Sequence, residues 1–467
     1  MPGNLPEVHT LLIQPPFNQD ERRRAPSQLM SMATVANGLA STLVLDGQSL
    51  GLTIQELAEM AASTRAAITG ISMLSPTFPA SVKLAQLIKA LRPETLMLAG
   101  GKHVTLAHEQ VIASGAFDLL ALGEGDEVLP KVISAQLSSG HNLKEIQQRL
   151  SNLPGVTYPG DPFIPRLAPP VNINQLPAVD WNILYPDIRS YLGQTASVED
   201  SRGCVHDCTY CSASITRKGV SFREPMQVKK DVENLLQIGF VDIFFNGDDC
   251  FINPKRTMEM LETIATIKLP FTLALNARAD SFMRCYRKFG QRFLTGLMNA
   301  HVKTLHIGIE SGDPNILQLV NKKLSIEDVF QTISIANRLG IIAETNWIVG
   351  LPDDSEVSIH NSIEFALKLR ERSGPHFPHL SYFMPYPGTL DAKRAAESGL
   401  YNPATFDLSR LTAHDKPILP TKSLSVKQVK GLYIKFLEKF YSPQFISSLP
   451  IGEFRSKAQK MYLKLKK

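Results

Sequence analysis

The segment Ser201-Arg-Gly-Cys-Val-His-Asp-Cys-Thr-Tyr-Cys211 decides the architecture of this chain. It holds three of the five cysteines within eight residues, in the spacing Cys-x3-Cys-x2-Cys. An odd number of cysteines with three so close together is not the pattern of a disulfide framework. The pattern instead indicates a metal site in a reducing compartment, placed directly after a strand that the sequence predicts at residues 195–199.

Thiolates this close in the chain, on Cys204, Cys208 and Cys211, can ligate three irons of one cubane [4Fe–4S] cluster. Three ligands for four irons leave one iron open, and an open iron can chelate a substrate, much as an open zinc position does. The alternatives are a zinc site and a chance cluster. Zinc normally takes four ligands with paired spacing, and its only nearby fourth ligand, His206, lies within the loop, which disfavours zinc.

Outward from the cysteines, strand and helix patterns alternate along the second half of the chain. Strands are predicted at residues 195–199, 241–246, 271–276, 304–309, 343–349 and 379–383, and helices at 227–236, 256–267, 326–339 and 356–370. Six βα units favour an open (β/α)6 barrel of the TIM type, whose active-site residues lie at the carboxyl ends of the strands. The chain after about residue 387 reads as helical, most clearly at 426–441.

The N-terminal part predicts a second α/β domain. Strands are expected at residues 10–14, 42–46, 67–72, 95–99 and 117–122, and helices at 27–40, 54–62, 80–91, 106–114 and after Gly125. This alternation predicts a parallel, Rossmann-like sheet covered on both faces, with ligands at the carboxyl ends of its strands. Turn residues follow each of those strands: Gln14-Pro15-Pro16, Asp46-Gly47, Ser72-Met73-Leu74-Ser75-Pro76, Gly100-Gly101-Lys102-His103 and Gly123-Glu124-Gly125.

Between these two series the alternation of strand and helix patterns stops, and eight prolines fall between residues 152 and 186. This stretch reads as a connector that wraps rather than packs. We therefore predict an α/β domain at residues 1–140, a Pro-rich connector at 141–194, a barrel core at 195–395 and a helical C-terminal region at 396–467.

Composition limits the class of protein. The 467 residues are 43% hydrophobic and 20% charged, with a net charge of +5, which fits a globular protein and is too mild to call for nucleic acid. An anionic cofactor or substrate would explain the positive charge as well. The first residues are polar, and no apolar run reaches the ~20 residues that span a bilayer, so we expect a cytoplasmic protein with no transmembrane segment.

The cysteine motif, with Tyr210 just before its last cysteine, resembles the signature of the radical S-adenosylmethionine (SAM) enzymes, and the likeness covers about residues 195–389. The resemblance implies that the open iron binds SAM and that an electron from an external flavodoxin- or ferredoxin-like donor cleaves it to a 5′-deoxyadenosyl radical. That radical removes a hydrogen atom from an unactivated position. No catalytic side chain is assigned, because this abstraction needs no acid or base.

Residues at the other strand ends match the family by position. Phe245-Asn246-Gly247-Asp248-Asp249 lacks the family's common Gly-Gly-Glu form, and Asp248 could instead cap a helix. Glu310 could contact SAM or form a structural turn. The SAM contacts that the resemblance implies are Tyr210, Asn246, Asp248, Asn276, Arg278, Glu310 and Gly350.

The N-terminal domain resembles the cobalamin-binding domain that precedes many radical SAM cores. The cobalamin contacts that this resemblance implies are Ser72, Ser75, Gly100, Gly101, His103, Gly123 and Glu124. The Asp-x-His-x-x-Gly signature of methionine-synthase-type domains is absent, so we expect His103 to be a structural or nucleotide-contacting residue rather than a cobalt ligand. A vestigial domain that no longer binds cobalamin is the alternative.

These resemblances imply a cobalamin-dependent radical SAM enzyme that methylates an unactivated carbon of a small-molecule or peptide substrate through methylcobalamin. One alternative is a cyclase or rearrangement enzyme that transfers no methyl group, and another is a non-enzymatic iron–sulfur or cobalamin sensor or carrier. A methylthiotransferase is disfavoured, because no cysteine precedes Cys204. We expect Cys250 to be an ordinary buried thiol, and Cys285 has no assigned role.

Overall fold

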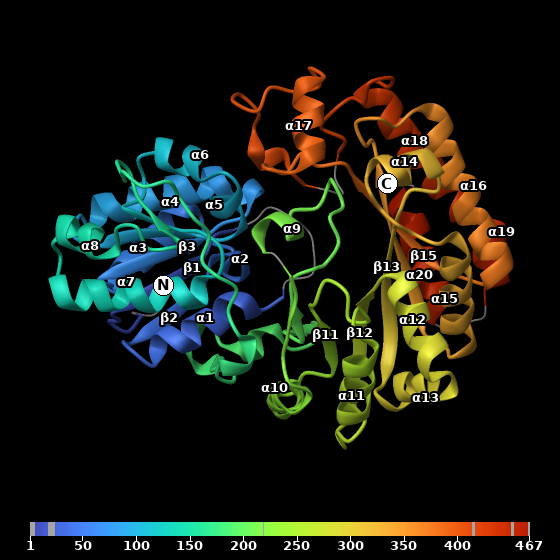
Figure 1. Ribbon diagram of the computed structural model, residues 1–467, viewed down its shortest axis with the longest axis horizontal. Coiled ribbons are helices and arrows are strands. Elements are labelled where there is room, and N and C mark those ends of the chain that lie inside the picture. The colour runs from blue at the N-terminus through green and yellow to red at the C-terminus, as the bar shows by residue number, and fades with distance from the viewer. Residues whose placement is uncertain (1–4, 17–23, 218, 413–415, 450–452, 466–467) are drawn as a thin grey trace. The chain divides into compact units, whose positions relative to one another are not determined.

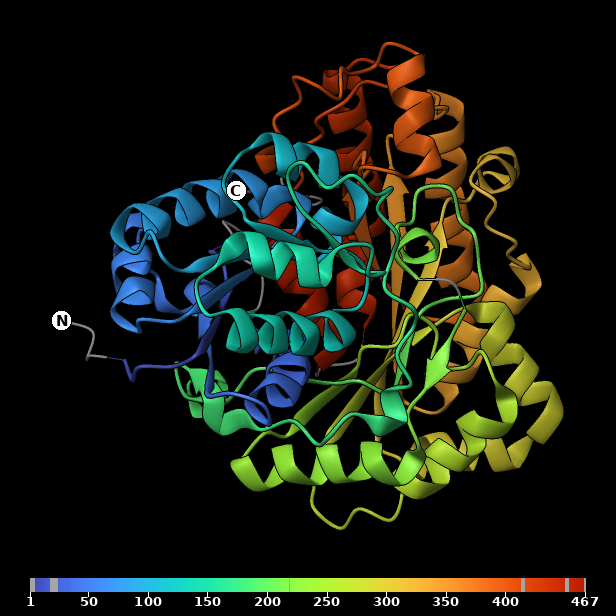
Figure 2. The same cartoon turned by 60° about the vertical axis from the view of Figure 1, so that its left-hand side comes forward.

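The structure is a computed structural model that describes residues 5–16, 24–217, 219–412, 416–449 and 453–465. The chain forms two compact units. The first comprises residues 1–205, 212–241 and 407–410, and the second comprises residues 206–211, 242–406 and 411–467. Figures 1 and 2 show the chain coloured from its N-terminus in blue to its C-terminus in red.

The first unit contains a seven-stranded sheet with the strand order β6-β5-β4-β3-β1-β2-β7. All of its pairs are parallel except β5 with β6. The strands are β1 (Thr10–Gln14), β2 (Thr42–Asp46), β3 (Ile68–Ser72), β4 (Leu96–Gly100), β5 (Leu119–Ala121), β6 (Val156–Thr157) and β7 (Leu184–Tyr185). Their helices are α1 (Ser27–Asn37), α2 (Gly47–Leu50), α3 (Ile54–Ser63), α4 (Phe78–Leu91), α5 (Lys102–Leu106), α6 (His108–Ala113), α7 (Gly125–Ser139) and α8 (Leu143–Leu150), with the 3-10 turn η1 (Ser75–Thr77).

The central strands of this sheet are buried along nearly their whole length because helices cover both faces, as parallel sheets require. Leu57 of α3 and Leu84 of α4 pack on one face against Leu11 and Ile13 of β1. Helices α1 and α7 pack together on the other face (Figure 1). The bounds predicted for β1 and β2 are confirmed to the residue. The helix predicted at residues 106–114 is present as α6, which begins at His108 and ends at Ala113, whereas the short helix α5 before it was not predicted.

The Pro-rich stretch packs against the first sheet, so the expectation that it wraps rather than packs is wrong. β6 pairs with β5 at one edge of the sheet and β7 pairs with β2 at the other. Ile173 and Tyr191 are buried in the same stretch, and the Tyr191 hydroxyl donates to Asp46 Oδ2 at 2.5 Å. The physical reason is that sheet edges carry unpaired backbone groups, which short extended segments satisfy.

The remaining elements of the first unit are short apart from one helix. They are η2 (Ile173–Gln175), η3 (Trp181–Ile183), η4 (Ile188–Tyr191), β8 (Ala196–Val198), β9 (Ser201–Arg202), α9 (Ala213–Thr216), β10 (Ser221–Phe222), α10 (Pro225–Ile238) and η5 (Leu408–Arg410). β9 and β10 form an antiparallel pair on either side of the cysteine loop in the chain.

The second unit contains the parallel strands β11 (Asp242–Phe245), β12 (Thr272–Ala277), β13 (Val302–Glu310), β14 (Ile342–Val349) and β15 (Phe377–Tyr382), paired in chain order. The helices are α11 (Pro254–Ile264), α12 (Ala279–Phe289), α13 (Gln291–Asn299), α14 (Pro314–Leu319), α15 (Ile326–Arg338), α16 (Glu356–Ser373), α17 (Leu390–Glu397), α18 (Val426–Phe440), α19 (Pro443–Ser448) and α20 (Glu453–Leu465). Strands alternate with helices from β8 to β15 along the chain, as the partial (β/α)6 barrel predicts, and the helical C-terminal region is confirmed.

The two faces of this second sheet differ. On the helix-covered face Leu305 and Ile307 of β13 are fully buried, and Trp347 of β14 packs its ring against Phe365 of α16 and Phe436 of α18. The alternate residues of the same strands face the opposite side, which we call the inner face, since side chains alternate along a strand. Figure 2 shows the strands of this unit side by side, in yellow-green to orange. Within the described ranges, no helix combines the length and apolarity needed to cross a bilayer.

Candidate cofactor sites

The cysteine loop is pinned on both sides by hydrogen bonds within the second unit. The Thr209 amide donates to the Val320 carbonyl at 3.1 Å, and the Thr209 hydroxyl donates to Asp391 Oδ2 at 2.7 Å. The Asp391 amide in turn donates to the Thr209 carbonyl at 3.1 Å. Thr209 lies between Cys208 and Cys211 in the chain. Its hydrogen bonds to the C-terminal end of α14 and the N-terminal end of α17 therefore fix the loop next to two of the predicted cluster ligands.

The thiols of Cys204, Cys208 and Cys211 suit a cluster that takes one thiolate on each of three irons. The five cysteines form no disulfide. Within the described residues, no group of three or more histidine, cysteine, aspartate and glutamate side chains is arranged to hold a single metal ion. A zinc ion would need its ligands gathered around one point, whereas a cubane takes each thiolate on a different iron. Three thiols on one loop, none of them in a disulfide, are the donor set that such a cluster takes.

Polar side chains from three segments meet beside this loop. Glu310, at the carboxyl end of β13, lies 3.0 Å from the Lys322 ammonium, and both side chains are buried. Tyr210 hydrogen bonds to Glu310, and burial, followed by the charges of Glu310, Cys208 and Cys211, raises the pKa of Tyr210 well above its usual value. Tyr210 therefore stays a neutral donor, held by a carboxylate that a lysine fixes in place. Sequence reasoning missed Lys322.

Gly308 lies next to the ion pair at the Glu310 turn. Glu310 has a φ of +70°, and a Cβ added to Gly308 would lie 2.6 Å from Glu310 Oε1 and 2.9 Å from Lys322 Nζ. A side chain at position 308 would have to displace the ends of Glu310 and Lys322, so glycine leaves room for this ion pair as it stands. The segment Gly308-Ile-Glu-Ser-Gly312 thus builds a buried charge pair, and a structural and a SAM-contacting role for Glu310 are compatible.

The ends of β11 and β12 are joined to each other. The Asn276 side-chain amide donates to the Gly247 carbonyl at 2.9 Å. Arg278 is buried, with Nε donating to Asp280 Oδ1 at 3.1 Å and Nη2 donating to the Lys323 carbonyl at 2.8 Å. Burial, followed by the charge of Arg278, lowers the pKa of His206. These contacts bring the strand ends, Arg278 and the cysteine loop into one region, whereas Asp248 is exposed.

Gly350 occupies a separate turn at the carboxyl end of β14. Its amide donates to Asp354 Oδ2 at 2.9 Å, and its φ is +85°. An added Cβ would lie 2.9 Å from Val429 of α18. The structure thus gives Gly350 a backbone role at this turn.

The predicted cobalamin residues lie at the carboxyl ends of β3, β4 and β5. The Met73 amide donates to the Gly100 carbonyl at 2.8 Å, so the loops after β3 and β4 are joined. Gly101 has a φ of +100°, and a Cβ there would lie 2.5 Å from the Met73 carbonyl oxygen. The Gly123 amide donates to Thr105 Oγ1 at 3.0 Å. These close backbone approaches form a glycine-lined rim at the carboxyl ends of the strands, where open parallel sheets bind their ligands.

His103 is fully buried in that rim. Its Nδ1 lies 3.1 Å from the Ser75 hydroxyl, and its ring packs against Phe78 with the centroids 4.6 Å apart. Its Nε2 has no hydrogen-bond partner among the residues that the structure describes. Burial lowers the pKa of His103 to about 4, so the ring is neutral at physiological pH. The interactions support a structural role, with one nitrogen left for a bound ligand.

The buried His103 makes stability depend on pH. The folded protein keeps this ring neutral down to about pH 4, whereas the unfolded chain protonates it near pH 6.5. The unfolded state therefore binds more protons between these values, so stability falls as the pH is lowered from about 6.5 to about 4. Denaturant unfolding of His103→Gln is expected to show less loss on acidification than wild type, by up to about 3 kcal/mol. His141→Gln, at an exposed position, is the control, and equal acid sensitivity of wild type and His103→Gln would contradict the assignment.

Glu124 differs from the other rim residues, because its carboxylate is already engaged by protein groups. Its Oε2 accepts from the Val171 amide at 2.9 Å and from Arg202 Nη1 at 3.0 Å, and its Oε1 pairs with Arg217. Arg202 also contacts Asp126 at 2.8 Å and both oxygens of Glu199. The sequence did not predict this network. Its one sign in the sequence is Arg202, two residues before Cys204.

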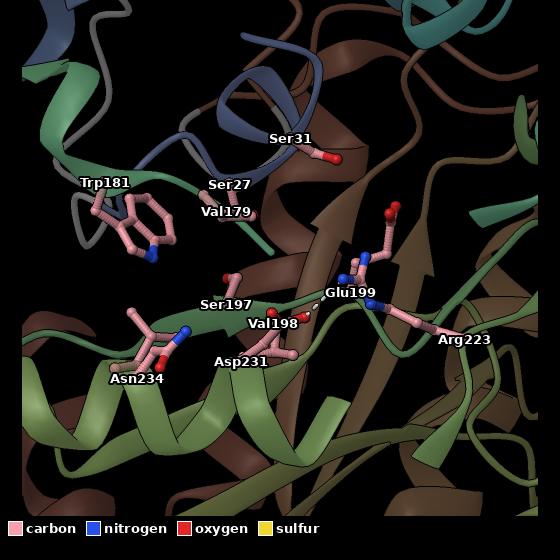
Figure 3. Close-up of a pocket in the computed structure, with 11 residues that line it drawn as sticks. Ser27, Ser31, Val179, Trp181, Ser197, Val198, Glu199, Arg223, Asp231 and Asn234 are labelled. Atoms are coloured by element: carbon pink, nitrogen blue, oxygen red, sulfur yellow. Dashed lines mark ion pairs between the residues drawn. The ribbon is translucent and has the colours of Figure 1, made fainter. Parts of the chain in front are cut away.

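A small pocket lies elsewhere in the first unit, lined from α1, β8 and α10 (Figure 3). Trp181 and Asn234 lie at one side of it, and the ion pair between Arg223 and Asp231 lies at the other, at 3.2 Å. Burial raises the pKa of Asp231 to about 6 although the charge of Arg223 opposes this. The pocket contains none of the predicted site residues, so we treat the pair as structural.

Comparison with known proteins agrees with this arrangement. The Radical SAM superfamily matches residues 198–366, and the B12 binding domain matches residues 33–133. An uncharacterised methyltransferase of Pyrococcus horikoshii is 24% identical over 92% of each chain. The anaerobic magnesium-protoporphyrin IX monomethyl ester cyclase of Rubrivivax gelatinosus is 22% identical over 75% of this chain and 62% of that protein.

A solved structure shows the same fold along nearly the whole chain. The cobalamin-dependent SAM radical enzyme OxsB, with aqua-cobalamin and SAM bound, superimposes with a TM-score of 0.76. The match has 15% identity and covers 98% of this chain and 71% of that one. Both domain families are thus found in this chain: an N-terminal B12 binding domain is followed by a radical SAM domain, and the two domains imply a [4Fe–4S] cluster, SAM and cobalamin as cofactors.

Proposed function

We propose that this enzyme transfers a methyl group to an unactivated carbon of its substrate. The observation that carries the proposal is the match to a methyltransferase-named relative over 92% of both chains, because it spans both cofactor domains. When bound, the cluster with SAM supplies a carbon-centred radical and cobalamin supplies the methyl group.

The residues of the chain have three tasks in this proposal. Cys204, Cys208 and Cys211 would hold the cluster, and the hydrogen bonds of Thr209 fix the loop that carries them. Around SAM, the neutral Tyr210 and the Glu310–Lys322 pair would offer a donor and a fixed pair of charges. Such preorganised groups orient a reactive cofactor and exclude side reactions.

Asn246, Asp248, Asn276, Arg278 and Gly350 are proposed to complete the SAM site. The Asn276–Gly247 hydrogen bond holds two of these strand ends in one arrangement. At the cobalamin rim we propose Ser72, Ser75, Gly100, Gly101, His103 and Gly123 as the contacts. Glu124 is not among these contacts. Its carboxylate binds Arg202 and Arg217, so we propose that it holds these arginines in place and does not touch cobalamin.

The products formed from SAM distinguish methyl transfer from the alternatives. We would reconstitute the protein anaerobically with iron, sulfide and cobalamin, reduce it and supply SAM. S-adenosylhomocysteine is expected beside 5′-deoxyadenosine when cobalamin is present, and 5′-deoxyadenosine alone when cobalamin is omitted. The omission is the control, because only the methyl donor is removed.

A cyclase without methyl transfer is the second candidate, favoured by the likeness to the Rubrivivax cyclase. It would form 5′-deoxyadenosine and no S-adenosylhomocysteine even with cobalamin bound. That result would overturn the methyltransferase proposal and leave the radical SAM assignment standing. An intact cluster with no cleavage of SAM would instead favour a sensor or carrier.

A further inference from the structure

Two short strands, β9 and β10, bracket the cysteine loop in the chain. β9 ends at Arg202, two residues before Cys204, and β10 begins at Ser221, ten residues after Cys211. The two strands pair antiparallel, with Arg202 opposite Ser221. Both strands lie in the first unit, as does the rim loop that follows β5. The stretch with the three predicted cluster ligands therefore starts and ends on one antiparallel ribbon.

One carboxylate joins this ribbon to the rim loop. Glu124 directly follows Gly123, a proposed cobalamin contact. Glu124 Oε2 accepts from Arg202 Nη1 at 3.0 Å, and Glu124 Oε1 pairs with Arg217, which follows α9. The side chains of Glu124 and Arg217 are 10% and 6% exposed, respectively. Glu124 thus binds one arginine that precedes the three cysteines in the chain and one that follows them.

A second connection between the same segments runs through the Val171 backbone. The Val171 amide donates to Glu124 Oε2 at 2.9 Å. The Val171 carbonyl oxygen accepts from Arg217 Nη2 and from Ser221 Oγ, each at 3.4 Å. Arg217 Nη2 also donates to Ser221 Oγ. Hydrogen bonds within the first unit therefore join the rim loop to Arg217 and to the start of β10.

The Arg217 side chain also packs against the backbone beside Cys204. Gly203 has a φ of +96°, and a Cβ added there would lie 2.8 Å from Arg217 Cδ and would collide with the Gly219 carbonyl oxygen. Glycine adopts such a conformation and permits such a close approach without strain. A shift of Arg217 would therefore disturb the residue that directly precedes the first predicted cluster ligand.

The network is built to hold a geometry. A guanidinium fixes direction as well as distance when it binds carboxylates through several of its N–H groups. Arg202 donates to Glu199 Oε1 at 2.8 Å and to Glu199 Oε2 at 2.7 Å, and it contacts Asp126 Oδ2 at 2.8 Å. Two oriented arginines thus grip Glu124, so a displacement of the rim loop has to move both of them.

We propose that Glu124, Arg202 and Arg217 are positioning residues that couple the cobalamin rim to the cysteine loop. The loop after β5 is held in one position when a corrin is bound, and the two arginines carry that position to the ribbon that leads to Cys204. Binding of each cofactor then tightens binding of the other, because coupling between two sites is reciprocal. The inference rests on the proposed cobalamin rim and not on methyl transfer.

The affinity for cobalamin, measured with and without the cluster, tests this coupling. Full-length protein would be prepared anaerobically with or without iron and sulfide, and the dissociation constant for hydroxocobalamin would be measured by equilibrium dialysis. The wild-type constant is expected to be at least about 5-fold lower with the cluster, at the lower end of typical coupling between sites. In Glu124→Gln and in Arg217→Met the ratio of the two constants is expected to fall to about 1, although both variants still bind the corrin.

Asp118→Asn is the matched control. Asp118 directly precedes β5, at the end of that strand opposite to the rim. Its Oδ2 accepts from Lys89 Nζ and from the Met97 amide, both at 2.8 Å. The variant therefore removes the charge of a similarly engaged carboxylate in the same sheet and should keep the wild-type ratio. Thermal melts verify that the variants are folded.

Hydrogen exchange adds a readout that a merely stabilising network would not change. In the cluster-loaded wild type, hydroxocobalamin is expected to slow amide exchange in the rim loops and also at residues 196–222. In Glu124→Gln the rim loops should still be protected, whereas residues 196–222 should exchange at the same rate with and without the corrin. Ordering that passes along the network predicts this difference.

A wild-type ratio near 1, equal ratios in wild type and Glu124→Gln, or an equal loss in Asp118→Asn would overturn the proposal. A wild-type protein that binds no corrin would overturn it as well. Absence of S-adenosylhomocysteine would remove the methyl-transfer function and leave the dialysis result unaffected. Absence of coupling would leave the products of SAM unaffected as the test of methyl transfer.

Discussion

Replacing Cys208 by alanine is expected to remove the iron–sulfur cluster and, with it, the cleavage of SAM. The proposed site has three ligands for four irons, so the variant retains only two. Iron and sulfide per chain should fall from about four towards background, and 5′-deoxyadenosine formation should fall more than about 100-fold. This loss is larger than the effect of removing a residue that only hydrogen bonds to a cluster ligand. Chemical iron analysis and the visible spectrum measure the first effect, and chromatography measures the second.

Cys285→Ala is the matched control for this experiment. Cys285 is fully buried, its Sγ lies 3.5 Å from the Phe251 carbonyl oxygen, and burial raises the pKa of its thiol to about 12. Such a thiol is a packing group and not a metal ligand. Cys285→Ala should therefore keep its iron and lose roughly 1 kcal/mol of stability. Full iron content in Cys208→Ala would refute the ligand assignment.

Replacing Arg202 by methionine is expected to cause the largest loss of stability among single substitutions outside the apolar cores. The guanidinium of Arg202 contacts three carboxylates, those of Glu124, Asp126 and Glu199, at 2.7 to 3.0 Å. Its side chain is 17% exposed, and those of its partners are 7% to 12% exposed. Removing the cation leaves three mostly buried negative charges together, which costs about 3–5 kcal/mol.

Denaturant unfolding measures this loss, and Arg189→Met is its control. Arg189 pairs with Asp187 at 3.3 Å, but the two side chains are 70% and 63% exposed, so that change should cost less than about 0.5 kcal/mol. Adding Glu199→Gln to Arg202→Met should recover part of the loss, because one repulsive charge is removed. Equal effects of Arg202→Met and Arg189→Met would show that the network contributes little.

Local patterns in the sequence were sufficient to predict most of the longer helices and strands. β1 and β2 were predicted to the residue because each is a short apolar run bounded by turn residues. The cysteine spacing predicted the cluster loop for a similar reason, since three ligands within eight residues are close in any fold. The short helix α5 was not predicted, because the Gly100-Gly101 pair directly before it indicates a turn.

The edges of the first sheet could not be predicted in this way. The two-residue strands β6 and β7 exist because β5 and β2 offer unpaired backbone groups, and no local propensity marks them. The prolines around them indicated an unpacked connector, yet tertiary contacts overrode that preference. The sequence of a few neighbouring residues does not determine which sheet edge a segment will pair with.

The sequence by itself determined the two domains, and it predicted the cysteine ligands and the strand ends where cofactor residues would lie. Only the tertiary structure decided the partners of those residues. It engaged Glu124 with Arg202 and Arg217, and it placed Lys322 against Glu310. The physical reason is that ligand spacing and strand periodicity are properties of neighbouring residues. Ion pairs between distant segments depend instead on strand register and loop closure, which exist only once the chain has folded.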